Sequence, residues 1–420
     1  MQLWQHVKKL SLPKIEFSYL LLVLLALITI SLNIKIIGEN EFSVLSEQFL
    51  KGRLYLPNAV GDAVLFKGRY FWHLGPFPAL MLVPLSFLTL GISTQPMPQG
   101  IANIFLIAGI LYLVYKISVR YGFAKNSSRW LALAVVFASV FFLSALLPWS
   151  WHFSQTVTFF LGLLALYEYI GRKNIFLIGL YHALMFMTRF TSGFGIIFYL
   201  LATVTSCATL KEKVKKCLLM ILPILLAGVF LLWYNYARFE NLFDSGYTTS
   251  NNWVRSSDTF RYEMLKYGLF NVKNIPTNIY YYFLSVPSPV FEKSTGFYRE
   301  IFKTNTSTII HLVKPYVKVS SPGVSFFVIS PIFLLMFRNR LKSKNSKYAA
   351  ATSGFILLFL LTYYWTGWTQ IGPRYMIDLL PFLLILLLES FDKKKITSRQ
   401  KLIITVSALF NIFLFFSLFS

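Results

Sequence analysis

The sequence predicts an all-α protein that crosses a membrane many times. Hydrophobic residues make up 56% of its 420 residues, with 42 Phe and 24 Tyr, and its mean hydropathy is +0.60. Runs of about 18 to 20 apolar residues follow one another, and each is long enough to cross a bilayer as a helix. The alternating ten-residue segments of a membrane barrel do not occur in the sequence. We therefore expect about eleven transmembrane helices in a single integral membrane domain, residues 1–420.

The charge of the chain fits this fold class. The 40 Lys and Arg outnumber the 16 Asp and Glu, which gives a formal net charge of +24. The basic residues lie in short clusters between apolar runs, which is the positive-inside pattern and excludes a nucleic-acid partner. Cys207 and Cys217 flank one such cluster and do not indicate a disulfide framework. No P-loop, G-x-G-x-x-G, H-E-x-x-H or C-x-x-C motif occurs, which argues against an ATP-driven pump or a zinc site.

The first apolar run, at 17–36, predicts an uncleaved membrane anchor that follows a cytoplasmic, lysine-containing N-terminus. Further runs predict the later spans, and the last span follows Lys401. These runs lie at 101–118, in pairs within 130–170 and 174–210, and at 218–236, 322–337, 348–366 and 374–390. With the basic clusters between them in the cytoplasm, the N-terminus lies inside and the C-terminus outside the cell membrane.

The run at 77–92 is the exception, because it is short and contains prolines at positions 78 and 84. Proline is poorly tolerated inside a regular span, so we expect a juxtamembrane or re-entrant helix on the outer face. A twelve-span alternative would place the cluster at 116–129 outside, or else the long loop at 237–321 inside.

The eleven-span topology gathers the polar segments on one face. The two long outer loops, 37–98 and 237–321, hold ten of the 16 acids. The shorter segments at 148–155, 189–193 and 367–374 face the same side. Rare charged residues beside a membrane usually serve a function, so this convergence predicts a single outward-facing site.

Arginines mark the outer ends of several predicted spans. Arg374 and Asp378 lie four residues apart at the start of a span, where they can pair along a helix. Arg189 separates two short apolar runs, and Arg238 opens the long loop. Each arginine can bind a phosphate in the outer headgroup zone, or can serve as a structural ion pair or an interfacial anchor.

Aromatic and histidine side chains accompany these cations. The first outer loop carries Arg69 and His73 among aromatic residues, and the segment PWSWHFSQ carries Trp151 and His152. Such rings can stack on sugars, pack against lipid tails, or form the aromatic belt that is common at membrane interfaces.

Several motifs occur in an order that resembles the C-type membrane glycosyltransferase (GT-C) superfamily. They are ENEF, EQFLKGRLYL, GRYFWHLGPFPAL, MTRFTSG, YNYARFENLFDSGY and GPRYMIDLLP. The superfamily includes dolichyl-phosphate-mannose protein mannosyltransferases and the lipid A aminoarabinose transferase, and the chain is most similar to their small bacterial relatives. The likeness covers nearly the whole chain in its layout.

The resemblance implies a polyprenyl-phosphate sugar donor and a glycan, lipid or protein acceptor on the outer face. It also implies a carboxylate after the first span that acts as a base or binds a divalent cation. The matching residues are Glu41 and, second, Glu39, whereas the usual aspartate of the family is absent. The expected substrate-binding residues are Arg69, His73, Trp151, His152, Arg189, Arg238, Arg374 and Asp378.

Elementary chemistry supports the same expectation. Transfer from a phosphate-linked sugar needs a base for the acceptor proton and cations for the departing phosphate. A polysaccharide polymerase or ligase with lipid-linked substrates remains an alternative, although it does not predict the early acidic loop. A transporter is a further alternative, but it would place charged residues or broken helices near the bilayer midplane, and the predicted mid-span positions are nearly free of ionisable residues.

Overall fold

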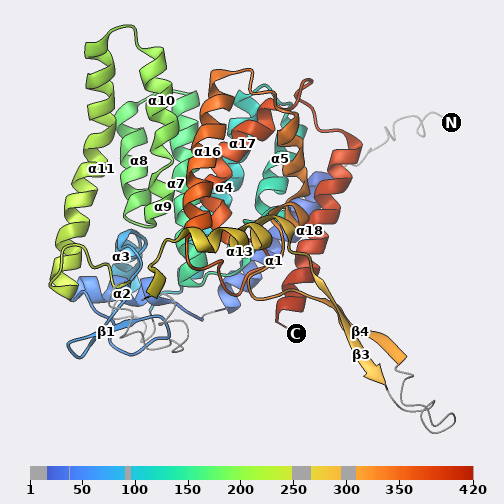
Figure 1. Cartoon of the computed structure of the whole chain (residues 1–420), viewed down its shortest axis with the longest axis horizontal. Helices are drawn as coiled ribbons and strands as arrows, with labels where there is room; N and C mark the ends of the chain where they lie inside the picture. Colours follow the sequence, from blue (N-terminus) through green and yellow to red (C-terminus); the bar gives the residue numbers. More distant parts are fainter. Residues whose placement is uncertain (1–16, 37, 90–95, 248–265, 295–308, 420) are drawn as a thin grey trace, which may run out of the picture.

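The computed structural model describes residues 17–36, 38–89, 96–247, 266–294 and 309–419. Its main body is a bundle of long, roughly antiparallel helices (Figure 1). These helices are α1 (Phe17–Lys35), α4 (Gln99–Arg120), α5 (Lys125–Phe137), α7 (Ser150–Ile170), α8 (Ile175–Phe186), α10 (Ile196–Ser206), α11 (Leu210–Phe239), α16 (Lys344–Thr362), α17 (Leu380–Glu389) and α18 (Ser398–Leu418).

Shorter elements connect the long helices. The short α-helices are α2 (Glu41–Leu50), α3 (Phe77–Thr89), α6 (Phe142–Leu146), α9 (Phe190–Gly193), α13 (Ile275–Ile279) and α15 (Phe326–Ile329). The 3₁₀ segments are η2 (Val272–Asn274), η4 (Pro331–Arg338) and η5 (Arg374–Leu379), and η3 (Tyr280–Leu284) is a π-helical turn.

The prediction of an all-α chain is corrected by two antiparallel hairpins. One pairs β1 (Val64–Phe66) with β2 (Arg69–Phe71), and the other pairs β3 (Ser288–Ser294) with β4 (Ile309–Lys318). Both lie in segments that the sequence assigned to outer loops, where backbone groups must find partners without a long helix. Parts of these loops, at 90–95, 248–265 and 295–308, lie outside the described residues, as do the N-terminal 16 residues.

Five helices of the described chain are long and apolar enough to cross a membrane: α1, α4, α7, α11 and α18. They correspond to five of the predicted spans. The other predicted spans contain helices, but several of these helices are shorter or interrupted. The sequence at 130–147, for example, forms α5 and α6 with a break between them, and 322–337 forms α15 followed by η4.

The two breaks lie against each other inside the bundle, which explains how they are tolerated. The backbone N–H of Val140 donates to Ser330 Oγ over 2.8 Å. The side-chain amide of Asn411, on α18, donates to the carbonyls of Phe137 at 3.3 Å and Ile329 at 3.1 Å. Backbone groups freed from helices are therefore satisfied by polar side chains, as the low-dielectric interior requires.

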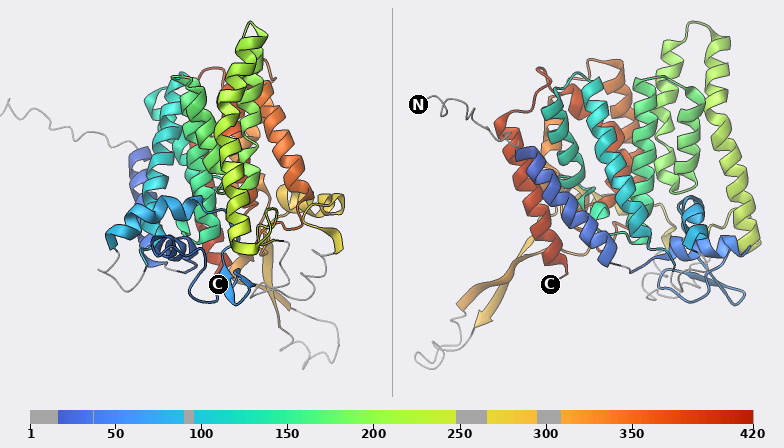
Figure 2. Two further views of the ribbon diagram at one scale, coloured as in Figure 1. Left: turned by 90° about the vertical axis from the view of Figure 1, so that its left-hand side faces the viewer. Right: turned by 180° about the vertical axis from the view of Figure 1, so that it is seen from behind.

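The first loop closes one end of the bundle, which we call the α2 end. Helix α2 lies across this end, with α3 and the β1–β2 hairpin nearby, and α18 finishes at the same end (Figures 1 and 2). With 13 residues, α3 spans about 20 Å, which is short for a bilayer crossing.

Close backbone contacts hold the α2 end together. A Cβ atom on Gly100 would lie 2.0 Å from the carbonyl oxygen of Asn33, so glycine lets α4 approach the end of α1. Likewise, a Cβ on Gly75 would lie 2.1 Å from the carbonyl oxygen of Met187, so the first loop packs directly on the turn after α8. Substitution at either glycine would separate segments that build the site described next.

Candidate functional site

The charged segments predicted to face the outside meet at the α2 end. Asp62 of the first loop contacts Trp151 at the start of α7, and Trp151 in turn lies beside Arg374. The side chain of Asp378 contacts Arg189 in the turn between α8 and α9. We call the group formed by Glu41, Asp62, Trp151, Arg374 and Asp378, together with Arg189, the carboxylate–arginine cluster.

Glu41 is the buried carboxyl of this cluster. Glu41 is the first residue of α2, and only 6% of its surface is exposed. Its backbone N–H donates to Ser150 Oγ over 3.0 Å. Its Oε2 atom has no hydrogen-bond partner among the described residues. Burial raises the pKa of Glu41 from 4.5 to about 7, against a hydrogen bond from Ser150 that lowers it, and the charges of Glu39 and Asp62 add to the rise.

Glu39, the second candidate for the base, has a different position. It is exposed, and its backbone adopts a left-handed conformation with φ 47°. Its carbonyl oxygen accepts hydrogen bonds from the backbone N–H of Ser150 at 3.0 Å and from Gln99 Nε2 at 3.1 Å. The backbone of Glu39 thus joins α4 and α7 to the start of α2, while its carboxylate acts electrostatically on Glu41 and Arg374.

Asp62 is a member of the cluster that sequence reasoning did not select. Its Oδ2 accepts a hydrogen bond of 2.8 Å from Trp151 Nε1, and its carbonyl oxygen lies 2.9 Å from His73 Nδ1. The signal was present, because Asp62 is one of four acids in the first loop. Its distance along the chain from the first span concealed its proximity to Glu41, which only the folding of the loop produces.

His73 has a supporting position beneath Asp62. The residue is 3% exposed, and its ring lies 5.0 Å from that of Trp151 and 4.8 Å from that of Tyr247. Burial lowers the pKa of His73 to about 3, opposed by the hydrogen bond to the Asp62 carbonyl and assisted by the charge of Arg238. The ring is therefore neutral at neutral pH, and Nδ1 carries the proton because its partner is a carbonyl.

The expected pairing of Arg374 with Asp378 is wrong. These residues lie in η5, a 3₁₀ helix, in which residues three apart share a face and residues four apart are turned about a third of a turn away. Asp378 instead accepts from Arg189 Nε at 3.4 Å and from Thr191 Oγ1 at 2.6 Å. The ion pair is deeply buried, with side-chain exposures of 10% for Arg189 and 0% for Asp378.

Arg374 consequently keeps guanidinium nitrogens without a hydrogen-bond partner among the described residues. The residue is 6% exposed, and its Nε and Nη1 atoms have no hydrogen-bond partner among the described residues. Its Cζ lies 5.7 Å from the ring of Trp151 and 5.4 Å from that of Tyr375. Buried N–H groups without partners are costly, so an arginine held in this way is a candidate to receive an anionic ligand.

His152 follows Trp151 in the sequence, and its side chain faces the interior of the helix bundle. The residue is 1% exposed, and its Nδ1 lies 3.2 Å from Ser144 Oγ on α6. The charges of both Arg374 and Arg189 act on its ring. The structure therefore brings His152 to the inner side of the carboxylate–arginine cluster.

Besides His73 and His152, two more predicted binding residues are not members of the cluster. Arg69 is exposed on the β1–β2 hairpin, where its guanidinium covers the ring of Tyr55 at 4.8 Å. Arg238 is buried, but its donors are used: Nη1 donates to the Trp72 carbonyl at 2.7 Å and Nη2 to Asn235 Oδ1 at 2.9 Å. Arg238 thereby attaches the end of α11 to the first loop.

A cation site was also expected from the family resemblance. Among the described residues, no group of three or more His, Cys, Asp and Glu side chains is placed to hold a metal ion. A divalent cation beside Glu41 remains a prediction.

The comparisons with known proteins concern the arrangement of the helices. No family model and no curated protein matches the chain. One similar structure is ArnT from Cupriavidus metallidurans bound to undecaprenyl phosphate, with 12% identity, a TM-score of 0.49, and coverage of 94% of this chain and 62% of that chain.

The oligosaccharyltransferase of Archaeoglobus fulgidus is similar in two structures. Its apo form shows 13% identity and a TM-score of 0.45, over 96% of this chain and 56% of that chain. The form tethered to an acceptor peptide by a disulfide bond shows 12% identity and a TM-score of 0.42, over 96% and 55%. This chain spans less than two thirds of the length of both proteins.

Proposed function

We propose that this chain is a membrane glycosyltransferase that moves a sugar from a polyprenyl-phosphate donor to an acceptor on the outer face. The observation that carries the proposal is that Asp378 pairs with Arg189 and not with Arg374. Because Asp378 neutralises Arg189, the buried guanidinium of Arg374 keeps free donors beside Trp151. A phosphate oxygen satisfies such donors better than any neutral group.

Glu41 supplies the second half of the chemistry. A general base works best when its pKa lies near the operating pH, and burial brings the pKa of Glu41 to about 7. In the proposed step, Glu41 takes the proton of the acceptor hydroxyl as the acceptor oxygen bonds to the anomeric carbon. The bond from that carbon to the phosphate oxygen breaks, and Arg374 stabilises the charge on the leaving phosphate.

The remaining cluster residues orient these two groups. Trp151 donates to Asp62, and its ring lies 5.7 Å from the guanidinium carbon of Arg374, so we assign this ring to stacking on the sugar of the donor. Arg189, paired with Asp378, lies against the ring of Tyr375 and so helps to position this ring, which also contacts Arg374. Apolar surfaces on the bundle would hold the lipid chain of the donor.

The position of the cluster favours this reading over the alternatives. It lies at the end of the bundle, whereas transporters place their substrate sites near the midplane. The participation of Glu41 and Asp62 makes the early acidic loop part of the site, which a polymerase or ligase reading did not anticipate.

A comparison of cell-envelope glycans by mass spectrometry tests the proposal. Cells that lack the protein should lose one sugar from an envelope component, and a copy of the wild-type gene should restore it. A gene encoding the Glu41→Gln variant, produced in equal amount, should not restore it. Identical glycans in all three strains would contradict a transferase function.

The proposal also places the α2 end outside the cell membrane, with a cytoplasmic N-terminus and an extracytoplasmic C-terminus. Single cysteines at two exposed serines test this orientation, after Cys207 and Cys217 have been replaced. An impermeant thiol reagent should label Ser288→Cys, on β3, in intact cells, and Ser398→Cys, at the start of α18, only after permeabilisation. The reverse pattern would overturn the orientation.

A further inference from the structure

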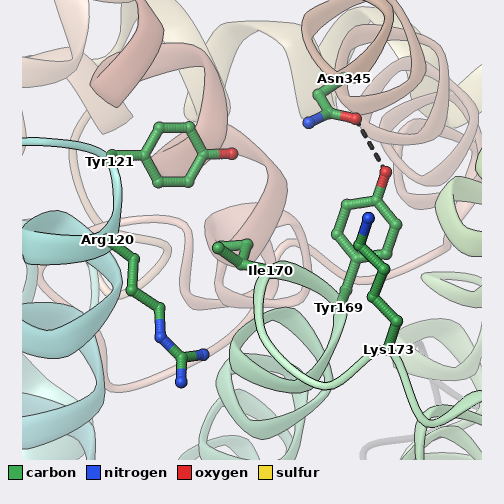
Figure 3. Close-up of a pocket in the computed structure, with 6 residues that line it drawn as sticks. All are labelled: Arg120, Tyr121, Tyr169, Ile170, Lys173 and Asn345. Atoms are coloured by element: carbon green, nitrogen blue, oxygen red, sulfur yellow. Dashed lines mark hydrogen bonds between the residues drawn. The ribbon is translucent and has the colours of Figure 1, made fainter.

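A cavity of about 260 Å³ lies at the opposite end of the bundle from the carboxylate–arginine cluster. At this end, which we call the basic end, α4 and α7 finish and α16 begins. The cavity is lined by Arg120, Tyr121, Tyr169, Ile170, Lys173 and Asn345 (Figure 3). It opens between three helix ends, so it is accessible from the surface at the level where spans meet the headgroup region.

The amide of Asn345 is oriented as a donor toward this cavity. Tyr169 Oη donates to Asn345 Oδ1 over 2.9 Å, which assigns the oxygen to the side of Tyr169. The amide nitrogen then points away from Tyr169, on the side of Tyr121, as Figure 3 shows. Its two N–H groups are presented to the cavity.

Arg120 is held in place without using all its donors. Its Nη1 donates to the carbonyl of Tyr167 over 2.6 Å, and its Cζ lies 3.6 Å from the centre of the Tyr167 ring. A Cβ atom on Gly171 would lie 2.5 Å from the same Nη1, so this glycine leaves room for the guanidinium. An arginine has five N–H donors, and the Arg120 hydrogen bond to Tyr167 uses one of them among the residues that the structure describes.

The second cation comes from the turn between α7 and α8. Lys173 adopts a left-handed conformation with φ 57°, and its side chain extends back along Tyr169 toward the cavity (Figure 3). The six lining residues thus include two cations and an amide donor, but no carboxylate. Glu389 has an electrostatic effect on both Tyr121 and Tyr169, but it does not line the cavity, and it accepts a hydrogen bond from Ser343.

We propose that this cavity binds a phosphate group, supplied by the headgroup of an anionic lipid. Two cations and an oriented amide around a space without acids match the acceptor oxygens of a phosphate. A basic pocket between the ends of membrane helices is also a typical location for anionic lipid headgroups. The site is separate from the carboxylate–arginine cluster and does not depend on the transferase activity.

The decisive variant is Asn345→Asp. It keeps the oxygen that accepts from Tyr169 but replaces the N–H donors with negative charge. Asn345 lies in the first turn of α16, where an acidic residue favours the helix dipole, so folding should be preserved. Asn126→Asp is the matched control, because Asn126 occupies the same position in the first turn of α5 and does not line the cavity.

A second pair of variants removes one positive charge each. Lys173→Gln changes a lining residue, whereas Arg172→Gln changes its exposed neighbour, which does not line the cavity. The full-length protein is purified, placed in nanodiscs containing phosphatidylglycerol or phosphatidylcholine, and analysed by native mass spectrometry for retained lipid. A separate arm measures the shift in Tm with inorganic phosphate or glycerol 3-phosphate in detergent.

The wild-type protein and both controls should retain phosphatidylglycerol in preference to phosphatidylcholine. Asn345→Asp and Lys173→Gln should bind it about tenfold more weakly, as expected for the loss of one charge-assisted hydrogen bond. Preference for phosphatidylglycerol that is equal in Asn345→Asp and the wild type would overturn the proposal. A response of the wild type to soluble phosphate alone, without lipid selectivity, would overturn the lipid as the source of the phosphate.

Discussion

The two ends of the helix bundle carry charge in opposite ways. At the α2 end, Glu41, Arg374 and Asp378 are buried, and the loops that hold them pack tightly on the helix ends. At the basic end, Arg120 and Lys173 are exposed around an open cavity. Similar side chains therefore experience a low dielectric at one end and water at the other.

This difference determines what the charges can do. Burial strengthens each electrostatic interaction and shifts proton affinities, which is the condition for catalysis. Exposed cations keep their charge, are screened by salt, and suit the reversible binding of anions. If the α2 end depends on burial and on its particular ion pairing, substitutions of its buried charges should have larger effects than the same substitutions at exposed positions.

The largest effect should follow from Glu41→Gln. The substitution removes the proposed base with little change in volume, and loss of general-base catalysis typically costs about 10²–10⁴-fold in rate. Transfer measured with purified protein should fall by that amount, while protein yield stays near normal. Glu47→Gln, on the same helix but partly exposed, is the control and should retain activity. Activity of Glu41→Gln within tenfold of the parent would count against its role.

Asp378→Asn should affect stability. It leaves the buried guanidinium of Arg189 without its counter-charge, and breaking one partner of a buried pair costs on the order of 3 kcal/mol. Thermal unfolding in detergent should show a lower Tm. Combining Asp378→Asn with Arg189→Gln should be less damaging than the sum of the two single changes. Additive losses would show that the two residues do not act as a pair.

Arg374→Lys should lower activity by about 10- to 100-fold without changing the Tm, because lysine keeps the charge but loses the planar fork. Arg69→Lys makes the same change at the exposed hairpin arginine and should leave transfer unchanged. Full activity of Arg374→Lys would separate this arginine from the donor phosphate. A loss of transfer activity in Arg69→Lys would show that Arg69 contributes to the site.

The smallest effect concerns pH. The pKa of Glu41 is raised from 4.5 to about 7 in the folded chain, so the folded state binds more protons than the unfolded state between these values. Stability from this group should therefore fall as pH rises from about 4.5 to about 7, whereas transfer should increase as the base loses its proton. Melting curves of the wild type should show this slope, and those of Glu41→Gln should lack it. An equal dependence of Tm on pH in the wild type and in Glu41→Gln would contradict the raised pKa of Glu41.

The position of the candidate site could be predicted from the sequence because it depends on a repeating pattern. Apolar runs of span length and the basic clusters between them place alternate loops at the same end of a bundle. The meeting of the first loop with 148–155, 189–193 and 367–374 follows from that alternation, and the structure brings all four segments together at the α2 end.

The sequence did not determine the partners within the site. Arg374 and Asp378 have helical spacing, but η5 is a 3₁₀ helix and turns them apart, so Asp378 contacts Arg189, which is 189 residues away. Burial likewise separates Glu41 from Glu39, and the folding of the first loop brings in Asp62. Periodicity reports which segments leave water, because each span does so locally. Ion pairs and proton affinities depend on contacts between distant segments, and those exist only in the tertiary structure.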